Sequence, residues 1–312
     1  MPGVAKFDPR KDVPDLAGRV ILITGGTAGV GAATVIELAR HNPAHILFTG
    51  RNAKSAEATI AGARSVAPGV QVTFVQCDLA DLASVKAAAA KVLALITRLD
   101  ILVCNAGIMA KPAALSKDGY EIHFATNHLG HALLTTALQP LLCRTAADQP
   151  GADVRVVMMT SIAWRLAPSD GGIVFDRLRS TQEMPVFGRW LRYGQSKLAN
   201  MLWARELARR YGAQGVLAVS LHPGVVETGL VTDLGLADRL IVYLPNIGRV
   251  KTVEEGTHNL LWAIAAPRDR VKPGAFYEPV GRLSSSETKW SRDPKLGERL
   301  WDWTAEQLKP YL

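Results

Sequence analysis

The chain has 312 residues, and its 36 Lys and Arg against 28 Asp and Glu give a formal net charge of +8. Hydrophobic residues make up 48% and charged residues 21%, a balance that excludes wholesale disorder. No uninterrupted basic run exceeds two residues, so we expect no nucleic-acid partner; the excess charge is mostly solvated surface, with an anionic cofactor as its most specific use.

Short apolar runs alternate with helical patterns after a polar arm. The runs predict strands at 19–24, 45–49, 71–76, 100–104, 154–159, 216–221 and 275–277. Helical patterns occupy 30–40, 53–66, 82–97, 122–142, 192–211 and 252–265. The alternation predicts an α/β fold, a doubly wound, mainly parallel, seven-stranded Rossmann-type sheet with helices on both faces.

The chain contains no repeat or linker that divides it. We therefore expect an arm at 1–18, one dinucleotide-binding domain at 19–280 and an extension at 281–312. An irregular insertion at about 162–190 and a loop at about 225–250 are expected to border the substrate. The extension contains Trp290, Trp301, Trp303 and Tyr311, and so many rings should pack on the body. A substrate lid or a dimer contact are the alternatives.

A glycine-rich turn joins the first predicted strand to the first helix. It is Thr24-Gly25-Gly26-Thr27-Ala28-Gly29-Val30-Gly31. Glycines permit a tight turn and let backbone N–H groups approach a pyrophosphate at a helix N-terminus. We predict a dinucleotide site that includes Gly25, Thr27, Gly29, Val30 and Gly31.

The second predicted strand ends at Gly50-Arg51-Asn52 with no acidic residue. An Asp or Glu at this point would bind the ribose 2′-hydroxyl of NAD, whereas the Arg51 guanidinium suits a 2′-phosphate. We therefore predict NADP(H), with Arg51 and Asn52 in its site. The alternative is that Arg51 only decorates a surface loop.

Tyr193 and Lys197 are four residues apart on one face of a predicted helix. A cation held near a phenol favours the phenolate, so we expect Lys197 to lower the pKa of Tyr193 and make it a general acid and base. Ser161 closes the fifth strand, at the edge where open α/β sheets bind ligands, and its hydroxyl is placed to donate to a carbonyl oxygen.

Together these motifs resemble the short-chain dehydrogenase/reductase family from about Arg19 to Tyr277. The resemblance implies that Asp78 and Leu79 lie at the adenine, and that Asn105-Ala106-Gly107 steadies the fourth strand beside the adenosine. It implies that Asn127 positions a water-linked proton relay to Lys197. It also implies that the segment from Pro223 and Gly224 through Val226 to Thr228 contacts the nicotinamide and the phosphates. His123 and His131 share a helical face with Asn127 and are expected to be structural.

The expected function is an NADP(H)-dependent enzyme that interconverts a carbonyl and an alcohol, with Asn127, Ser161, Tyr193 and Lys197 as catalytic residues. The chain is similar to retinol dehydrogenase-like and fungal NADP-dependent members, and reduction of a ketone or aldehyde is the expected direction. Apolar residues in the two loops suggest a medium-to-large apolar substrate: Trp164, Phe187, Trp190, Leu230, Leu234 and Tyr243. The alternatives are that these aromatics only pack the insertion, and that the protein is a non-catalytic NADP(H)-binding regulator.

The three cysteines, Cys77, Cys104 and Cys143, have no metal-type spacing, so we expect no metal site. Cys77 and Cys104 lie in or beside apolar runs, so we expect them to be buried free thiols. The first 15 residues have no apolar stretch, and residues 122–143 are too polar for a membrane span. We expect a cytoplasmic protein without stable membrane insertion, and the family resemblance allows a homodimer.

Overall fold

The computed structural model describes residues 6–148, 151–184 and 187–312. Residues 1–5 of the expected arm and 185–186 of the expected insertion lie outside the described residues. All seven predicted strands are present and pair in parallel: β1 (Val20–Thr24), β2 (His45–Gly50), β3 (Gln71–Gln76), β4 (Ile101–Cys104), β5 (Val154–Met159), β6 (Val216–Leu221) and β7 (Phe276–Glu278). An eighth strand, β8 (Arg282–Leu283), pairs antiparallel with β7. Two residues are too few for a sequence pattern, so β8 was not predicted.

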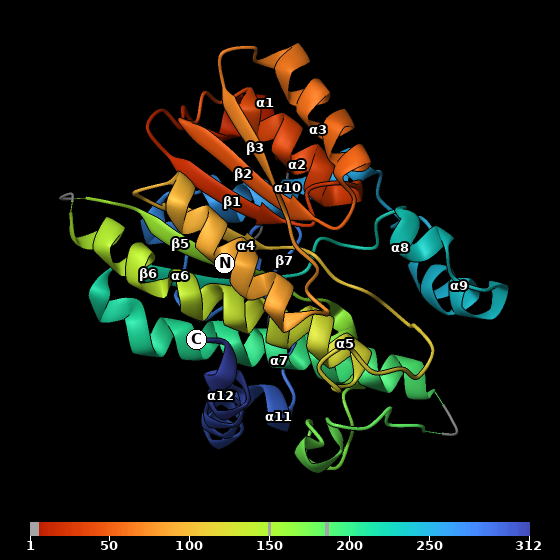
Figure 1. Cartoon of the computed structure of the whole chain (residues 1–312). Helices are drawn as coiled ribbons and strands as arrows, with labels where there is room; N and C mark the ends of the chain where they lie inside the picture. Colours follow the sequence, from red (N-terminus) through yellow and green to blue (C-terminus); the bar gives the residue numbers. More distant parts are fainter. Residues whose placement is uncertain (1–5, 149–150, 185–186) are drawn as a thin grey trace.

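Helices cover both faces of the sheet (Figure 1). On one face α2 (Gly29–Ala39), α3 (Ala53–Val66) and α10 (Val253–Ala265) supply buried side chains to a core with β1, β2 and β6. On the other face α4 (Leu82–Leu95), α6 (Gly130–Ala147) and α7 (Gly188–Tyr211) form the larger core. The shorter helices are α1 (Pro9–Asp12), α5 (Ile122–Phe124), α8 (Gly229–Thr232), α9 (Leu236–Tyr243) and α11 (Lys289–Arg292). Within the described ranges, no helix is long and apolar enough to cross a bilayer.

The strand order has a switch point at the centre of the sheet. The order is β3-β2-β1-β4-β5-β6-β7-β8, so successive strands are added toward one edge from β1 to β3 and toward the other edge from β4 onward. In open α/β sheets ligands bind at such a switch point, outside the carboxyl ends of the strands. The glycine turn after β1 and the Asn105-Ala106-Gly107 turn after β4 both lie at this point.

The C-terminal extension packs on the body, as its aromatic content predicted. It forms α12 (Pro294–Leu308), whose Leu300 and Leu308 are buried in the larger core. The Trp301 ring stacks on Trp203 of α7 with 4.2 Å between ring centroids. The extension therefore contributes to the hydrophobic core of the face that carries α7.

The long helix predicted at 122–142 is present in a modified form. It begins as α5, passes through a π-helical turn at Ala125–Leu129 and continues as α6 to Ala147. A π-turn inserts one extra residue into the helical repeat and is frequent at functional sites. Here it contains Asn127.

Candidate active site

The glycine turn between β1 and α2 is shaped by close contact with the turn after β4. Gly25 has a φ of +70°, and a Cβ on it would lie 2.9 Å from Ala106. A Cβ on Gly31 would lie 2.2 Å from the Gly25 carbonyl oxygen. The first residues of α2 have no side-chain cap, because Ala28 occupies the N-cap position. A helix N-terminus has free backbone N–H groups that can bind a phosphate. The glycines of the turn have no side chains that would keep a phosphate away from these groups.

Thr24 connects the two turns to the π-turn. Its Oγ1 accepts hydrogen bonds from the backbone N–H groups of Asn105 (2.9 Å) and Ala106 (3.0 Å). It also lies 2.8 Å from His131 Nε2, while His131 Nδ1 lies 2.9 Å from the Asn127 carbonyl oxygen. A carbonyl can only accept, so Nδ1 bears the proton and Nε2 accepts from Thr24. Burial lowers the pKa of His131 to about 4, which is consistent with this neutral tautomer.

The residues expected at the adenosine half lie along the ends of β2 and β3. Thr27 of the glycine turn packs against Gly50, where a Cβ would lie 2.5 Å from Thr27 Cγ2. Arg51 follows and is exposed, and Asn52 caps α3 by accepting from the Ser55 N–H at 3.2 Å. After β3, Asp78 Oδ1 accepts from the Ala80 N–H, and Leu79 is buried against Gly130.

Tyr193, Ser161 and Lys197 lie at the carboxyl end of β5. Ser161 lies close enough to the Tyr193 hydroxyl to act on its pKa, and the Lys197 ammonium lies 5.8 Å from the centroid of the Tyr193 ring. Burial raises the pKa of Tyr193 to about 12, although Ser161 acts in the opposite direction. The expected lowering of this pKa by Lys197 is therefore wrong for the protein alone. The cost of burying a phenolate outweighs the nearby cation.

Lys197 is itself buried, and burial lowers its pKa to about 8. Its Nζ donates to the Met159 carbonyl at 3.3 Å. A Cβ on Gly107 would lie 3.2 Å from this Nζ and 3.0 Å from Asn127 Oδ1, so Gly107 leaves room for both groups. The Lys197 ammonium and the Asn127 amide thus meet beside the turn after β4.

The Asn127 side chain is fixed by three hydrogen bonds. Its Oδ1 accepts from the Ile108 N–H at 2.8 Å, and its Nδ2 donates to the Ile108 carbonyl at 3.0 Å. Nδ2 also donates to Ser196 Oγ at 2.9 Å, and Ser196 donates to the Tyr193 carbonyl at 2.7 Å. Ser196 was not predicted as a site residue. Its position between Tyr193 and Lys197 in the sequence could have indicated that it lies at the site.

The segment after β6 reaches back to the glycine turn. Pro223 and Gly224 follow the strand, Val226 forms an isolated parallel bridge with Lys251, and Thr228 Cγ2 would lie 3.3 Å from a Cβ on Gly29. Lys251 was missed by the sequence analysis. Its side chain covers Gly224, where a Cβ would lie 2.9 Å from Lys251 Cδ, and burial lowers its pKa. This places another cation beside the expected phosphate site.

His123 belongs to a buried polar cluster next to Tyr193. Its Nδ1 lies 2.7 Å from Glu121 Oε1, and its Nε2 accepts from the Lys111 N–H at 2.9 Å. The Arg192 guanidinium lies 3.4 Å from the same carboxylate and donates to the Gln182 carbonyl. His123 and His131 are both fully buried and hydrogen-bonded, as structural histidines usually are.

The apolar residues expected around the substrate lie in different surroundings. Trp164 is fully buried in the larger core, where it packs edge-on against Phe276, so it does not line the site. Phe187 and Trp190 line a cavity of about 850 Å³. Leu234 and Tyr243 pack on a small cluster that includes Tyr193 and Trp190. Leu230 is partly exposed.

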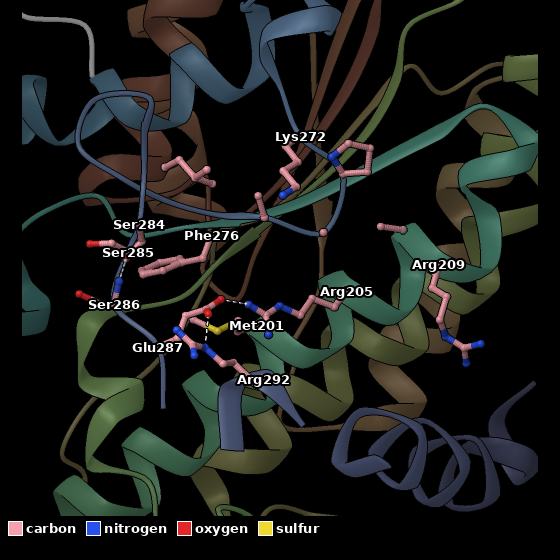
Figure 2. Close-up of a pocket in the computed structure, with 15 residues that line it drawn as sticks. Met201, Arg205, Arg209, Lys272, Phe276, Ser284, Ser285, Ser286, Glu287 and Arg292 are labelled. Carbon is pink, nitrogen blue, oxygen red and sulfur yellow. Dashed lines mark hydrogen bonds and ion pairs between the residues drawn. The ribbon is translucent and has the colours of Figure 1, made fainter. Parts of the chain in front are cut away.

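A second cavity, of about 720 Å³, lies between α7, β7 and the segment that leads to α11 (Figure 2). The four candidate catalytic residues are not among its lining. Glu287 pairs there with both Arg205 (3.0 Å) and Arg292. These ion pairs tie the segment before α11 to α7, which favours a structural role for this region.

Known proteins are similar to this chain over most of its length. Residues 19–166 match the family model for short chain dehydrogenases. A short-chain dehydrogenase/reductase, drtF of Aspergillus calidoustus, is 39% identical over 306 residues, which cover 95% of this chain and 96% of that protein. The chloroplastic short-chain dehydrogenase TIC 32 A of Brassica napus is 31% identical and spans 92% of this chain and 88% of its own length.

Solved structures show the same fold. A structure from Mycobacterium paratuberculosis, described as an uncharacterized protein, has 30% identity and a TM-score of 0.73, with 97% of this chain and 98% of that chain covered. The NADPH-bound carbonyl reductase from chicken fatty liver has 24% identity and a TM-score of 0.65, with 91% and 100% covered. The chain belongs to the short-chain dehydrogenase/reductase family of oxidoreductases.

Proposed function

We propose that the protein is an NADP(H)-dependent reductase of medium-to-large apolar ketones or aldehydes. The observation that supports this most is the meeting of Ser161, Tyr193, Lys197 and Asn127 beside the turn after β4, at the switch point of the sheet. Polar groups of this kind, gathered around a buried phenol, can donate a proton to a reacting oxygen and then replace the proton that the phenol has lost.

The residues around the glycine turn suit a nicotinamide dinucleotide. The uncapped N-terminus of α2 would hold the pyrophosphate, with Thr228 against Gly29, and Lys251 lies against Gly224 of the segment that would follow the cofactor. The exposed Arg51 would bind the 2′-phosphate of NADP, and no carboxylate among the described residues pairs with it. Asp78 and Leu79 would border the adenine. A bound dinucleotide would supply the hydride.

The chain's own residues would bind the substrate, orient its carbonyl group and protonate the carbonyl oxygen. Ser161 and Tyr193 would donate hydrogen bonds to the substrate carbonyl oxygen. Because its pKa is raised to about 12, Tyr193 holds its proton at neutral pH and can give it to the alkoxide as that charge develops. The phenolate of Tyr193 would then regain a proton through the polar residues around Asn127, and Lys197, with a pKa of about 8, would favour this step.

NADPH consumption with a panel of apolar ketones and aldehydes tests the proposal. Tyr193→Phe should lower the rate by about a hundred-fold or more, because the proton donor is lost, while NADPH still binds. Tyr211→Phe, at the far end of the same helix, is the matched control and should keep the wild-type rate. Undiminished activity in Tyr193→Phe would exclude the mechanism. NADPH binding without turnover of any carbonyl would favour a non-catalytic regulator.

A further inference from the structure

One short stretch of the chain exposes an unusual share of its apolar side chains. Thirteen large apolar residues of the described chain are exposed, and seven of them fall between positions 230 and 250. We define the outer cap face as Leu236, Leu240, Leu244 and Ile247, which are exposed by 80%, 54%, 60% and 75%. Contiguous apolar surface of this kind marks an interaction site.

The outer cap face is one side of a segment whose other side is already packed. Leu236, Leu240 and Leu244 are four residues apart on α9 and the turn that follows, so they form one stripe. The opposite side supplies Val242 to the cluster around Tyr193, and Tyr243 packs on this cluster from the edge of the stripe. Closing this segment over a substrate would therefore use the inner side and leave the outer cap face exposed.

Asp238 fixes the orientation of α9. Its carboxylate accepts hydrogen bonds from Arg189 Nη1 at 2.5 Å and from Trp190 Nε1 at 2.8 Å. Both partners belong to the first turn of α7, next to Tyr193. Turning the outer cap face inward would break both bonds and leave the buried Trp190 N–H without this partner, which is unfavourable. In Figure 1, α8 and α9 stand at the margin of the molecule, to one side of the sheet.

The charges near the outer cap face are mostly positive. Between 230 and 250 the carboxylates are Asp233, which is exposed, and Asp238, which is buried and paired, while Arg239 is partly exposed and Arg249 is exposed. An isologous contact between two copies would bring the arginines of both copies into one interface, where their positive charges repel one another. An apolar stripe flanked by arginines is instead complementary to an anionic lipid surface.

We propose that the outer cap face docks the protein peripherally on anionic lipid bilayers. The apolar side chains would enter the boundary between headgroups and acyl chains, and Arg239 and Arg249 would contact lipid phosphates. This docking does not require the proposed reductase activity. If that activity is also correct, the site around Tyr193 opens next to the membrane, where apolar carbonyl compounds partition.

Flotation of the full chain with vesicles tests the proposal directly. The wild type should float with phosphatidylcholine vesicles that contain phosphatidylglycerol, and less with phosphatidylcholine alone or at high salt. Leu236→Gln with Leu244→Gln should reduce the partition coefficient by about ten-fold or more, because two apolar side chains no longer enter the lipid. Arg239→Gln with Arg249→Gln should remove the preference for anionic vesicles.

The matched control is Leu93→Gln with Leu95→Gln, because these leucines of α4 are exposed by 43% and 45% outside the cap. It should float like the wild type. Near-UV circular dichroism and NADPH affinity check that each variant is folded. The proposal is overturned if the wild type does not float, if the Leu236/Leu244 variant floats equally well, or if sedimentation instead shows a dimer that this variant abolishes. A failure to reduce carbonyls would leave the flotation result intact.

Discussion

Tyr193 is held as a neutral phenol by its surroundings. Trp190 and His123 lie edge-on to its ring, with centroids 6.3 and 6.4 Å away. Burial by these neighbours explains why its pKa rises although Lys197 is near. A phenol that keeps its proton is suited to donate to a developing alkoxide. The reverse reaction would need the phenolate, and an additional positive charge near Tyr193 would favour that form.

Arg51 is the residue on which the cofactor assignment depends. Arg51→Ala should raise the dissociation constant of NADPH by about ten-fold or more and leave that of NADH nearly unchanged, because only NADPH has the 2′-phosphate that the guanidinium would bind. Titration of protein fluorescence with each dinucleotide measures both constants. Arg64→Ala, an exposed arginine at the other end of α3, is the control and should change neither. An equal loss for both dinucleotides in Arg51→Ala would contradict the role.

At the scale of elements, α12 is the largest addition to the expected fold. Leu300 is fully buried against the face that carries α7. Leu300→Ala should lower the free energy of unfolding by about 2 to 5 kcal/mol, since it removes a buried side chain and leaves a cavity. Urea unfolding followed by circular dichroism measures this change.

The control for this prediction is Leu93→Ala, a helical leucine exposed by 43%, which should change the free energy by less than about 0.5 kcal/mol. If Leu300→Ala were no more destabilising than this control, α12 would unfold separately from the sheet. The stacked Trp203 and Trp301 rings provide a second readout, because their near-UV signal should be lost in the same transition.

The sequence predicted the strands well because most of them are apolar on both faces and are followed by a helix with clear periodicity. It predicted the glycine turn and Tyr193–Lys197 because these are local patterns. The π-turn could not be predicted, since it depends on where Ile108 and Ser196 meet Asn127. Trp164 was misplaced for a similar reason. Its side chain could face the substrate or the core, and only tertiary packing against Phe276 decides this.

At the scale of the molecule, the sheet order brings distant parts of the chain to one edge. The turns after β1 and β4, the end of β5 and the segment after β6 all meet at the switch point. Buried histidines link these parts to the rest of the fold. His128 is 2.9 Å from Thr304 of α12, His131 joins Thr24 to Asn127, and His222 lies at the end of β6.

These three histidines should make the stability of the whole molecule depend on pH. Burial, together with nearby cationic groups, lowers the pKa of His128 and His222 to about 3 and that of His131 to about 4. The unfolded chain, with values near 6.5, therefore binds more protons below that pH than the native state does. Stability is fully present above about pH 6.5 and falls as the pH drops toward the native values, by about 1 kcal/mol for each histidine between pH 7 and 5.5.

Urea unfolding at several pH values between these limits measures this loss, and His128 offers a way to assign it. His128→Gln removes one titrating group, so its stability should fall less steeply with pH than that of the wild type, by about 1 kcal/mol between pH 7 and 5.5. Thr304→Val removes only the hydrogen-bond partner of His128, and should lower stability while leaving the imidazole and the pH dependence in place. An unchanged slope in His128→Gln would show that the acid sensitivity arises elsewhere, for example at paired carboxylates such as Asp153, whose pKa is lowered by Arg155 and Arg268 despite its burial. Those carboxylates protonate only at lower pH, so the range between pH 7 and 5.5 separates the two sources.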